Sequence, residues 1–74
     1  MNLTVGSRVM CVNLPDMNGR LVGQTGTIIE GNTHSFGVRF DKFIDGHDCT
    51  NGNCEYGYGW YIEERYLIPI PNIR

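Results

Sequence analysis

The chain has 74 residues, a hydrophobic content of 41% and a formal net charge of −2. This length allows one domain with one small core, and the composition excludes a disordered chain. No apolar run approaches the roughly 18 residues that a transmembrane helix needs, and the N-terminus lacks the features of a signal peptide, so we expect a cytosolic protein.

The first part of the chain predicts a strand followed by a loop. Residues 5–13 open with a turn and continue as a β-rich run in which Val9 and Cys11 share one face. Residues 14–23 contain the turn dipeptides Pro15-Asp16 and Asn18-Gly19, which favour a loop.

The middle of the chain predicts a β-hairpin. Residues 24–30 are rich in β-branched side chains, and residues 31–34 can reverse the chain. In residues 35–41, Phe36, Val38 and Phe40 alternate with small or polar residues, which indicates a strand with one buried face.

After a loop rich in Cys and Gly, three short elements are expected. Residues 60–62 have strand character, residues 63–66 fit one helical turn, and residues 67–70 read as an edge strand that tolerates Pro69. The sequence therefore predicts an all-β fold: one domain over residues 1–74, a small barrel of about five short antiparallel strands, with a loop at about 42–59 inserted between strands 3 and 4.

The inserted loop concentrates the specific chemistry of the chain. It holds His47, Cys49 and Cys54, which are three ligand types that zinc prefers, and Gly46, Gly52 and Gly57 permit tight turns there. An odd number of cysteines in a reducing compartment favours metal or free thiols over a disulfide. We expect a structural zinc ion; the alternatives are two free thiols pinned by Trp60, or a Cys49–Cys54 disulfide.

The fourth zinc ligand is left open by the sequence. The candidates are His34, Cys11, Asp45, Asp48, Tyr58 or water. Cys11 lies at an inward strand position and is expected to be a core residue. A catalytic zinc is not expected, because so small a barrel has little room for a substrate cleft, and we expect no enzymatic activity.

Two resemblances follow from these residues. The segments Val5-Gly6-x-Arg8-Val9, Gly23-x-x-Gly26-Thr27-Ile28 and Val38-x-Phe40-Asp41 resemble SH3-like barrels. Gly46-His47-x-Cys49, Cys54 and Gly57-Tyr58-Gly59-Trp60 resemble a family of very small phage-encoded SH3-like proteins, in which a second His stands where this chain has Tyr58. That resemblance implies His47, Cys49 and Cys54 as ligands, and a place in the host cell cytoplasm.

The charge distribution bears on function. Residues 41–74 carry six acidic against three basic side chains, whereas residues 1–40 carry two against three. Small acidic phage proteins resemble anti-CRISPR inhibitors, which implies stoichiometric binding to a basic host protein, such as a CRISPR effector nuclease of the Cas9 type. The residues expected at such an interface are Asp45, Asp48, Glu55, Tyr56, Tyr58 and Tyr61.

Two alternatives remain open from the sequence. An SH3-like nucleic-acid-binding or regulatory module would need a basic patch, and the basic residues are scattered along an acidic chain. A structural component of a virion is the other alternative.

Overall fold

The computed structural model describes residues 3–14, 20–31, 35–49 and 52–71. In these residues the chain forms one antiparallel sheet with the strand order β4-β3-β2-β1-β5. The elements are β1 (Arg8–Cys11), β2 (Thr25–Gly31), β3 (Phe36–Phe40), β4 (Gly59–Ile62), the 3-10 helix η2 (Glu64–Tyr66) and β5 (Leu67–Pro69). The prediction of an all-β fold with five short strands is confirmed.

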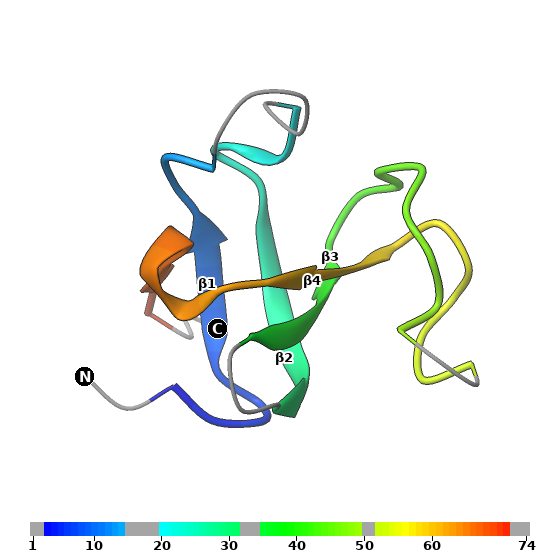
Figure 1. The fold of residues 1–74 in the computed structure, drawn as a ribbon, viewed down its shortest axis with the longest axis horizontal. Coiled ribbons are helices and arrows are strands. Elements are labelled where there is room, and N and C mark those ends of the chain that lie inside the picture. Colours follow the sequence, from blue (N-terminus) through cyan, green and yellow to red (C-terminus); the bar gives the residue numbers. More distant parts are fainter. Residues whose placement is uncertain (1–2, 15–19, 32–34, 50–51, 72–74) are drawn as a thin grey trace.

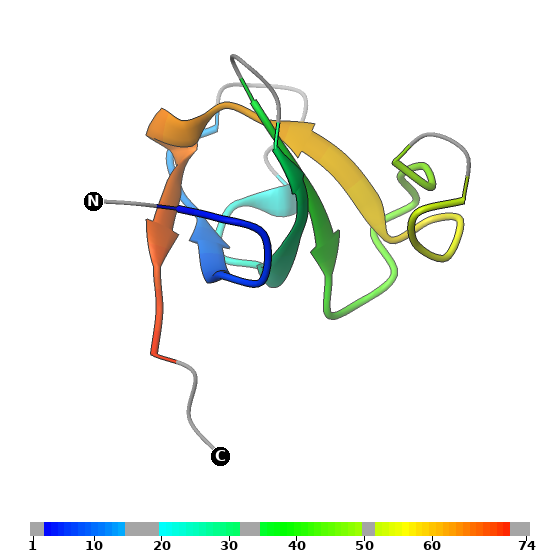
Figure 2. The same ribbon diagram turned by 90° about the horizontal axis from the view of Figure 1, so that it is seen from below.

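The sheet is bent into a small barrel-like shape (Figure 1). β4 runs across the direction of β1 and β2, and η2 leads the chain from the end of β4 to β5, which pairs with β1. Figure 2 shows the same arrangement from below, with β5 and β4 at opposite ends of the curved sheet. The single helical turn expected at residues 63–66 is therefore the corner that closes the fold.

The strand periodicity accounts for most of the core. Val9 and Cys11 of β1 are fully buried, as are Val38 and Phe40 of β3, while Arg39 between them is only partly buried. Gly26 of β2 is buried beside β3, where a Cβ atom would lie 2.5 Å from the carbonyl oxygen of Arg39 and 2.9 Å from a methyl group of the core residue Val38. The predicted inward faces of β1 and β3 are confirmed.

Three core residues come from outside the strands. Leu3, Leu21 and Ile44 are at least 92% buried and pack into the same cluster as the strand residues. Leu21 lies in the segment read as a loop, and Ile44 lies in the loop before β4. A domain this small needs these contributions, because four of its five strands have only three to five residues and supply few inward positions. The turn residues 15–19 and 32–34 lie outside the described residues.

Candidate functional site

The segment between β3 and β4, which we call loop 41–58, is folded back on itself by backbone hydrogen bonds. The amides of Ile44 and Gly46 both donate to the carbonyl of Gly57, at 2.9 and 3.0 Å. His47 and Gly59 exchange two bonds of 2.9 and 2.8 Å, which extends the sheet by one isolated bridge. The loop therefore has an internal framework that its polar, glycine-rich sequence did not indicate.

Cys49 and Cys54 lie next to each other against Gly59. A Cβ atom on Gly59 would be 2.6 Å from the Cys49 sulfur and 2.8 Å from the Cys54 sulfur. Both thiols are free, and Cys49 is fully buried. Only glycine fits at position 59, because the two sulfur atoms occupy the space that any side chain would need.

The thiols of this pair are held in their protonated form. Burial, reinforced by the neighbouring Cys54, raises the pKa of Cys49 to about 12. Burial also raises the pKa of Cys54. A thiophilic metal binding here would therefore have to displace protons from both sulfurs.

The His47 ring is fixed by one hydrogen bond and two aromatic neighbours. Its Nδ1 accepts a 2.9 Å hydrogen bond from the amide of Cys49, so in the neutral ring the proton lies on Nε2. The ring stacks on Trp60 at a centroid distance of 5.2 Å and lies 5.1 Å from the ring of Tyr61. Cys49 itself has a φ of 55°, a left-handed conformation unusual for cysteine, and its bond to His47 helps to hold it there.

The described residues supply two adjacent ligands for the expected zinc and do not assemble a complete set. No group of three or more His, Cys, Asp or Glu side chains suited to a metal occurs within residues 3–14, 20–31, 35–49 and 52–71. A tetrahedral zinc site needs four ligands, so the residues fit the metal only in part.

The candidates for the fourth ligand are dispersed. Cys11 belongs to the core cluster, as predicted, and Asp48 accepts a hydrogen bond from the Gly52 amide at 3.2 Å. Tyr58 packs edge-on against Phe43, and Asp45 is exposed. His34 lies outside the described residues.

Phe43 and Tyr58 of loop 41–58 form a ring contact, which we call the aromatic cluster. Phe43 packs on Gly57, and its ring meets that of Tyr58 edge-on at 5.8 Å. The Arg39 guanidinium lies 5.1 Å from the Tyr58 ring centroid and forms an ion pair of 3.1 Å with Glu55. Phe43 remains 60% exposed and Tyr56 is 75% exposed.

Phe43 was not among the interface residues expected from the sequence. In the sequence, Phe43 and Ile44 form an apolar pair. Only the structure shows that the Ile44 side chain is buried and the Phe43 side chain is exposed. Gly57 has a φ of 98° and no side chain, which lets the Phe43 ring pack directly against its backbone.

The acidic half of the chain is partly neutralised by basic side chains. Asp41 pairs with Arg8 at 2.7 Å, Glu55 with Arg39, and Glu63 with Arg65 at 3.0 Å. Asp45 and Glu64 form no ion pair within the described part of the chain. Of the three acids expected at an interface, Glu55 is ion-paired and Asp48 accepts a hydrogen bond from the Gly52 amide, so Asp45 is the one with neither kind of contact among the described residues.

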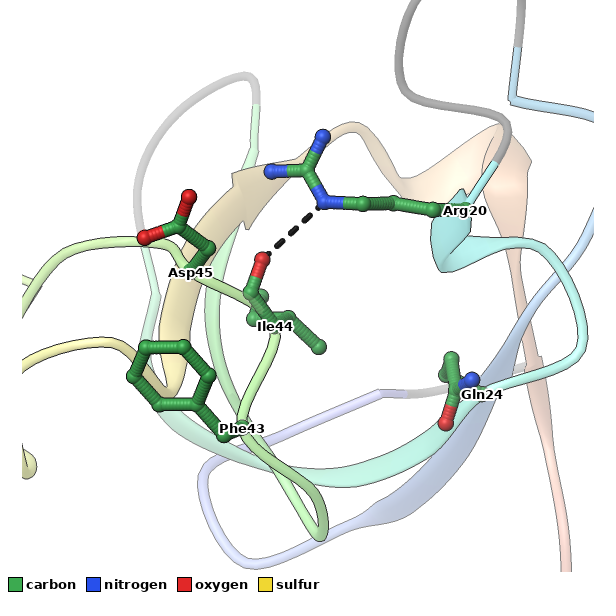
Figure 3. Close-up of a pocket in the computed structure, with 5 residues that line it drawn as sticks. All are labelled: Arg20, Gln24, Phe43, Ile44 and Asp45. Carbon is green, nitrogen blue, oxygen red and sulfur yellow. Dashed lines mark hydrogen bonds between the residues drawn. The ribbon is translucent and has the colours of Figure 1, made fainter.

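A groove of about 450 Å³ opens beside the aromatic cluster (Figure 3). Its lining residues, from two separate segments, are Arg20, Gln24, Phe43, Ile44 and Asp45. Arg20 donates from Nε to the Ile44 carbonyl oxygen at 3.0 Å, which anchors one segment to the other. Sequence reasoning missed this groove, because Arg20 and Gln24 are about 20 residues from the loop that completes it.

None of the helices in the described ranges is long and apolar enough to cross a membrane. Comparison of the chain with protein-family models, curated proteins and solved structures finds no match in any of the three.

Proposed function

We propose that this chain acts by stoichiometric binding to another protein, through the outer surface of loop 41–58, and not by catalytic turnover. The observation that carries this proposal is the exposure of two large aromatic side chains, Phe43 and Tyr56, on one short loop. Aromatic residues dominate the binding energy of protein interfaces, and a small domain gains no stability from exposing them.

The framework beneath these side chains supports the same function. The backbone hydrogen bonds of the loop and the packing of Phe43 on Gly57 hold the Phe43 ring in place before a partner binds. A preorganised surface loses less conformational entropy on binding than a flexible one.

The resemblance to small phage-encoded proteins extends the proposal to the kind of partner. We place the chain among inhibitors of a host defence effector, with a CRISPR effector nuclease as the first target to test. A basic surface on that target would complement the unpaired carboxylate of Asp45 beside the aromatic cluster.

The proposal includes one structural zinc with the adjacent thiols of Cys49 and Cys54 as ligands and His47 as the third, whose ring would have to leave its stacking on Trp60 to reach the metal. The contact of the two sulfurs with the same face of Gly59 supports the pair of thiol ligands. The metal would stabilise the loop, and no step of inhibition depends on it.

A titration of a CRISPR nuclease with the purified protein tests the proposal. We expect cleavage to fall linearly and to end near one equivalent of protein per nuclease. Phe43→Ala and Tyr56→Ala are expected to weaken inhibition at least tenfold, since interface aromatics often contribute more than about 2 kcal/mol. Val5→Ala is the matched control, because Val5 is 63% exposed and lies outside the loop.

Two results would count against the proposal. Complete inhibition by far less than one equivalent would indicate turnover, and unchanged binding by both aromatic variants would place the interface elsewhere.

A further inference from the structure

The groove beside loop 41–58 combines an apolar wall with two opposite charges. Phe43 and Ile44 supply the wall, and Arg20 and Asp45 supply the charges. In Figure 3 the Arg20 guanidinium and the Asp45 carboxylate lie on the same rim, with Phe43 below Asp45 and Gln24 at the other end. The volume of about 450 Å³ lies in the range of sites that bind one organic group.

The two charges are held apart and retain unused hydrogen-bonding atoms. Arg20 uses Nε for the Ile44 carbonyl, and its two terminal nitrogens form no hydrogen bond with any described residue. Asp45 forms neither a hydrogen bond nor an ion pair in the same part of the chain. The rim therefore offers donors on one side and an acceptor on the other.

These charges restrict what the groove can hold. A cationic side chain would be attracted by Asp45 but repelled by Arg20, and an anionic one the reverse, so neither sign of charge is favoured by the rim as a whole. A purely aliphatic group would leave the charged rim partly desolvated without a partner. A neutral ring with a hydrogen-bond donor avoids all three costs, because it can stack under a guanidinium, pack against Phe43 and donate to a carboxylate.

We propose that this groove takes one tryptophan or tyrosine side chain of the protein partner. The inference rests on the proposed function, since it names the anchor that the partner supplies. The ring packs between Arg20 and Phe43, and its N–H or O–H donates to Asp45. The groove and the exposed aromatic cluster share Phe43, so one partner surface can cover both.

The test uses N-acetyl-tryptophanamide as the probe and NMR chemical-shift changes as the readout. We expect millimolar binding, with shifts confined to residues 20–24 and 43–45. N-acetyl-phenylalaninamide, which lacks the side-chain donor, is expected to bind several-fold more weakly, and N-acetyl-lysinamide is expected not to bind.

Asp45 allows a matched pair of variants. Its φ is 59°, a conformation that both asparagine and glycine adopt, so neither change strains the loop. Asp45→Asn keeps an acceptor and is expected to retain part of the affinity. Asp45→Gly removes the acceptor and is expected to weaken tryptophan binding about tenfold, as loss of a hydrogen bond to a charged group implies.

Several results would overturn the inference: no shifts at the groove, equal binding of the phenylalanine derivative, or tighter binding of guanosine monophosphate. Its failure is distinguishable from that of the proposed function. If the wild type inhibits the nuclease but shows no shifts at the groove with the probe, the anchor alone is refuted. A probe seated in the groove of a protein that binds no nuclease refutes the function and leaves the groove.

Discussion

The guanidinium of Arg8 donates two hydrogen bonds, of 2.9 and 2.7 Å, to the carboxylate of Asp41, and so links β1 to the residue that follows β3. The Thr25 hydroxyl donates a third bond of 2.6 Å to the same carboxylate. Arg8 and Asp41 are 33 positions apart in the chain, and their ion pair fixes the point at which loop 41–58 leaves the sheet.

The ion pair predicts a pH dependence of stability. The hydrogen bond from Arg8 holds the pKa of Asp41 below its ordinary value of 3.8, so the folded state favours the ionised carboxylate. The stabilisation is therefore present above pH 3.8 and is lost as the pH falls from there through the lower pKa of the folded state.

The measurement compares urea unfolding of the wild type and of Asp41→Asn between pH 7 and pH 2.5. The carboxylate is 42% exposed, so we expect the variant to lose about 1 kcal/mol at most at neutral pH. The difference between the two proteins should shrink below pH 3.8. A constant difference over the whole range would show that the charge of Asp41 does not contribute.

Gly59 gives a prediction about the loop. Gly59→Ala forces a Cβ against both sulfurs of the thiol pair, so we expect a loss of roughly 1–3 kcal/mol of unfolding free energy from overpacking. Gly31→Ala is the control, because its Cβ would meet only the Phe36 ring at 3.7 Å, an ordinary contact. Thermal unfolding of the two variants should separate them clearly, and equal midpoints would contradict the close approach at Gly59.

The sequence predicted the sheet better than the site. Alternation in Phe36, Val38 and Phe40 reports directly on one buried face, so the strands could be placed from local pattern alone. The roles of Gly59 and Phe43 depend on contacts made across the loop, and no local pattern encodes them. Leu21 was missed for a similar reason, because its segment carries turn signals although its side chain is fully buried.

The sequence predicted which residues of the loop can bind a metal, but not how their side chains are arranged. Cys49 and Cys54 do lie together, whereas the ring of His47 is directed by its bond to the Cys49 amide and by stacking on Trp60. Spacing along the chain shows that three ligands are near one another in sequence. It does not show which of them share a face in a loop with positive φ at Asp45, Cys49, Gly52 and Gly57.

Zinc binding stays a prediction with a direct test. We expect elemental analysis of the untagged protein to give about one zinc per chain, and a chelator to lower the melting temperature of the wild type. Cys49→Ser and Cys54→Ser should lower that temperature, disorder residues 42–58 and remove the effect of the chelator. Cys11→Ala should keep the chelator effect and lose only roughly 1 kcal/mol of unfolding free energy, as a small core truncation does.

Two results would count against the zinc site: purified protein that is reduced and contains no metal, or equally mild effects of substitution at all three cysteines.

The last prediction concerns the charge that guides binding. Asp45 and Glu64 are both exposed and unpaired among the described residues, but Asp45 borders the aromatic cluster and Glu64 lies on η2. Asp45→Asn and Glu64→Gln therefore remove the same charge from two places. If loop 41–58 docks on a basic surface, Asp45→Asn should slow association with the nuclease several-fold and weaken its salt dependence, because charges interact strongly only within about 8 Å at physiological salt.

Glu64→Gln is the control and should change the association rate much less. Stopped-flow association at several salt concentrations measures the rate and its salt dependence for both variants. Equal slowing by the two variants would mean that net charge guides the encounter, and a larger effect of Glu64→Gln would move the interface to the η2 side of the barrel.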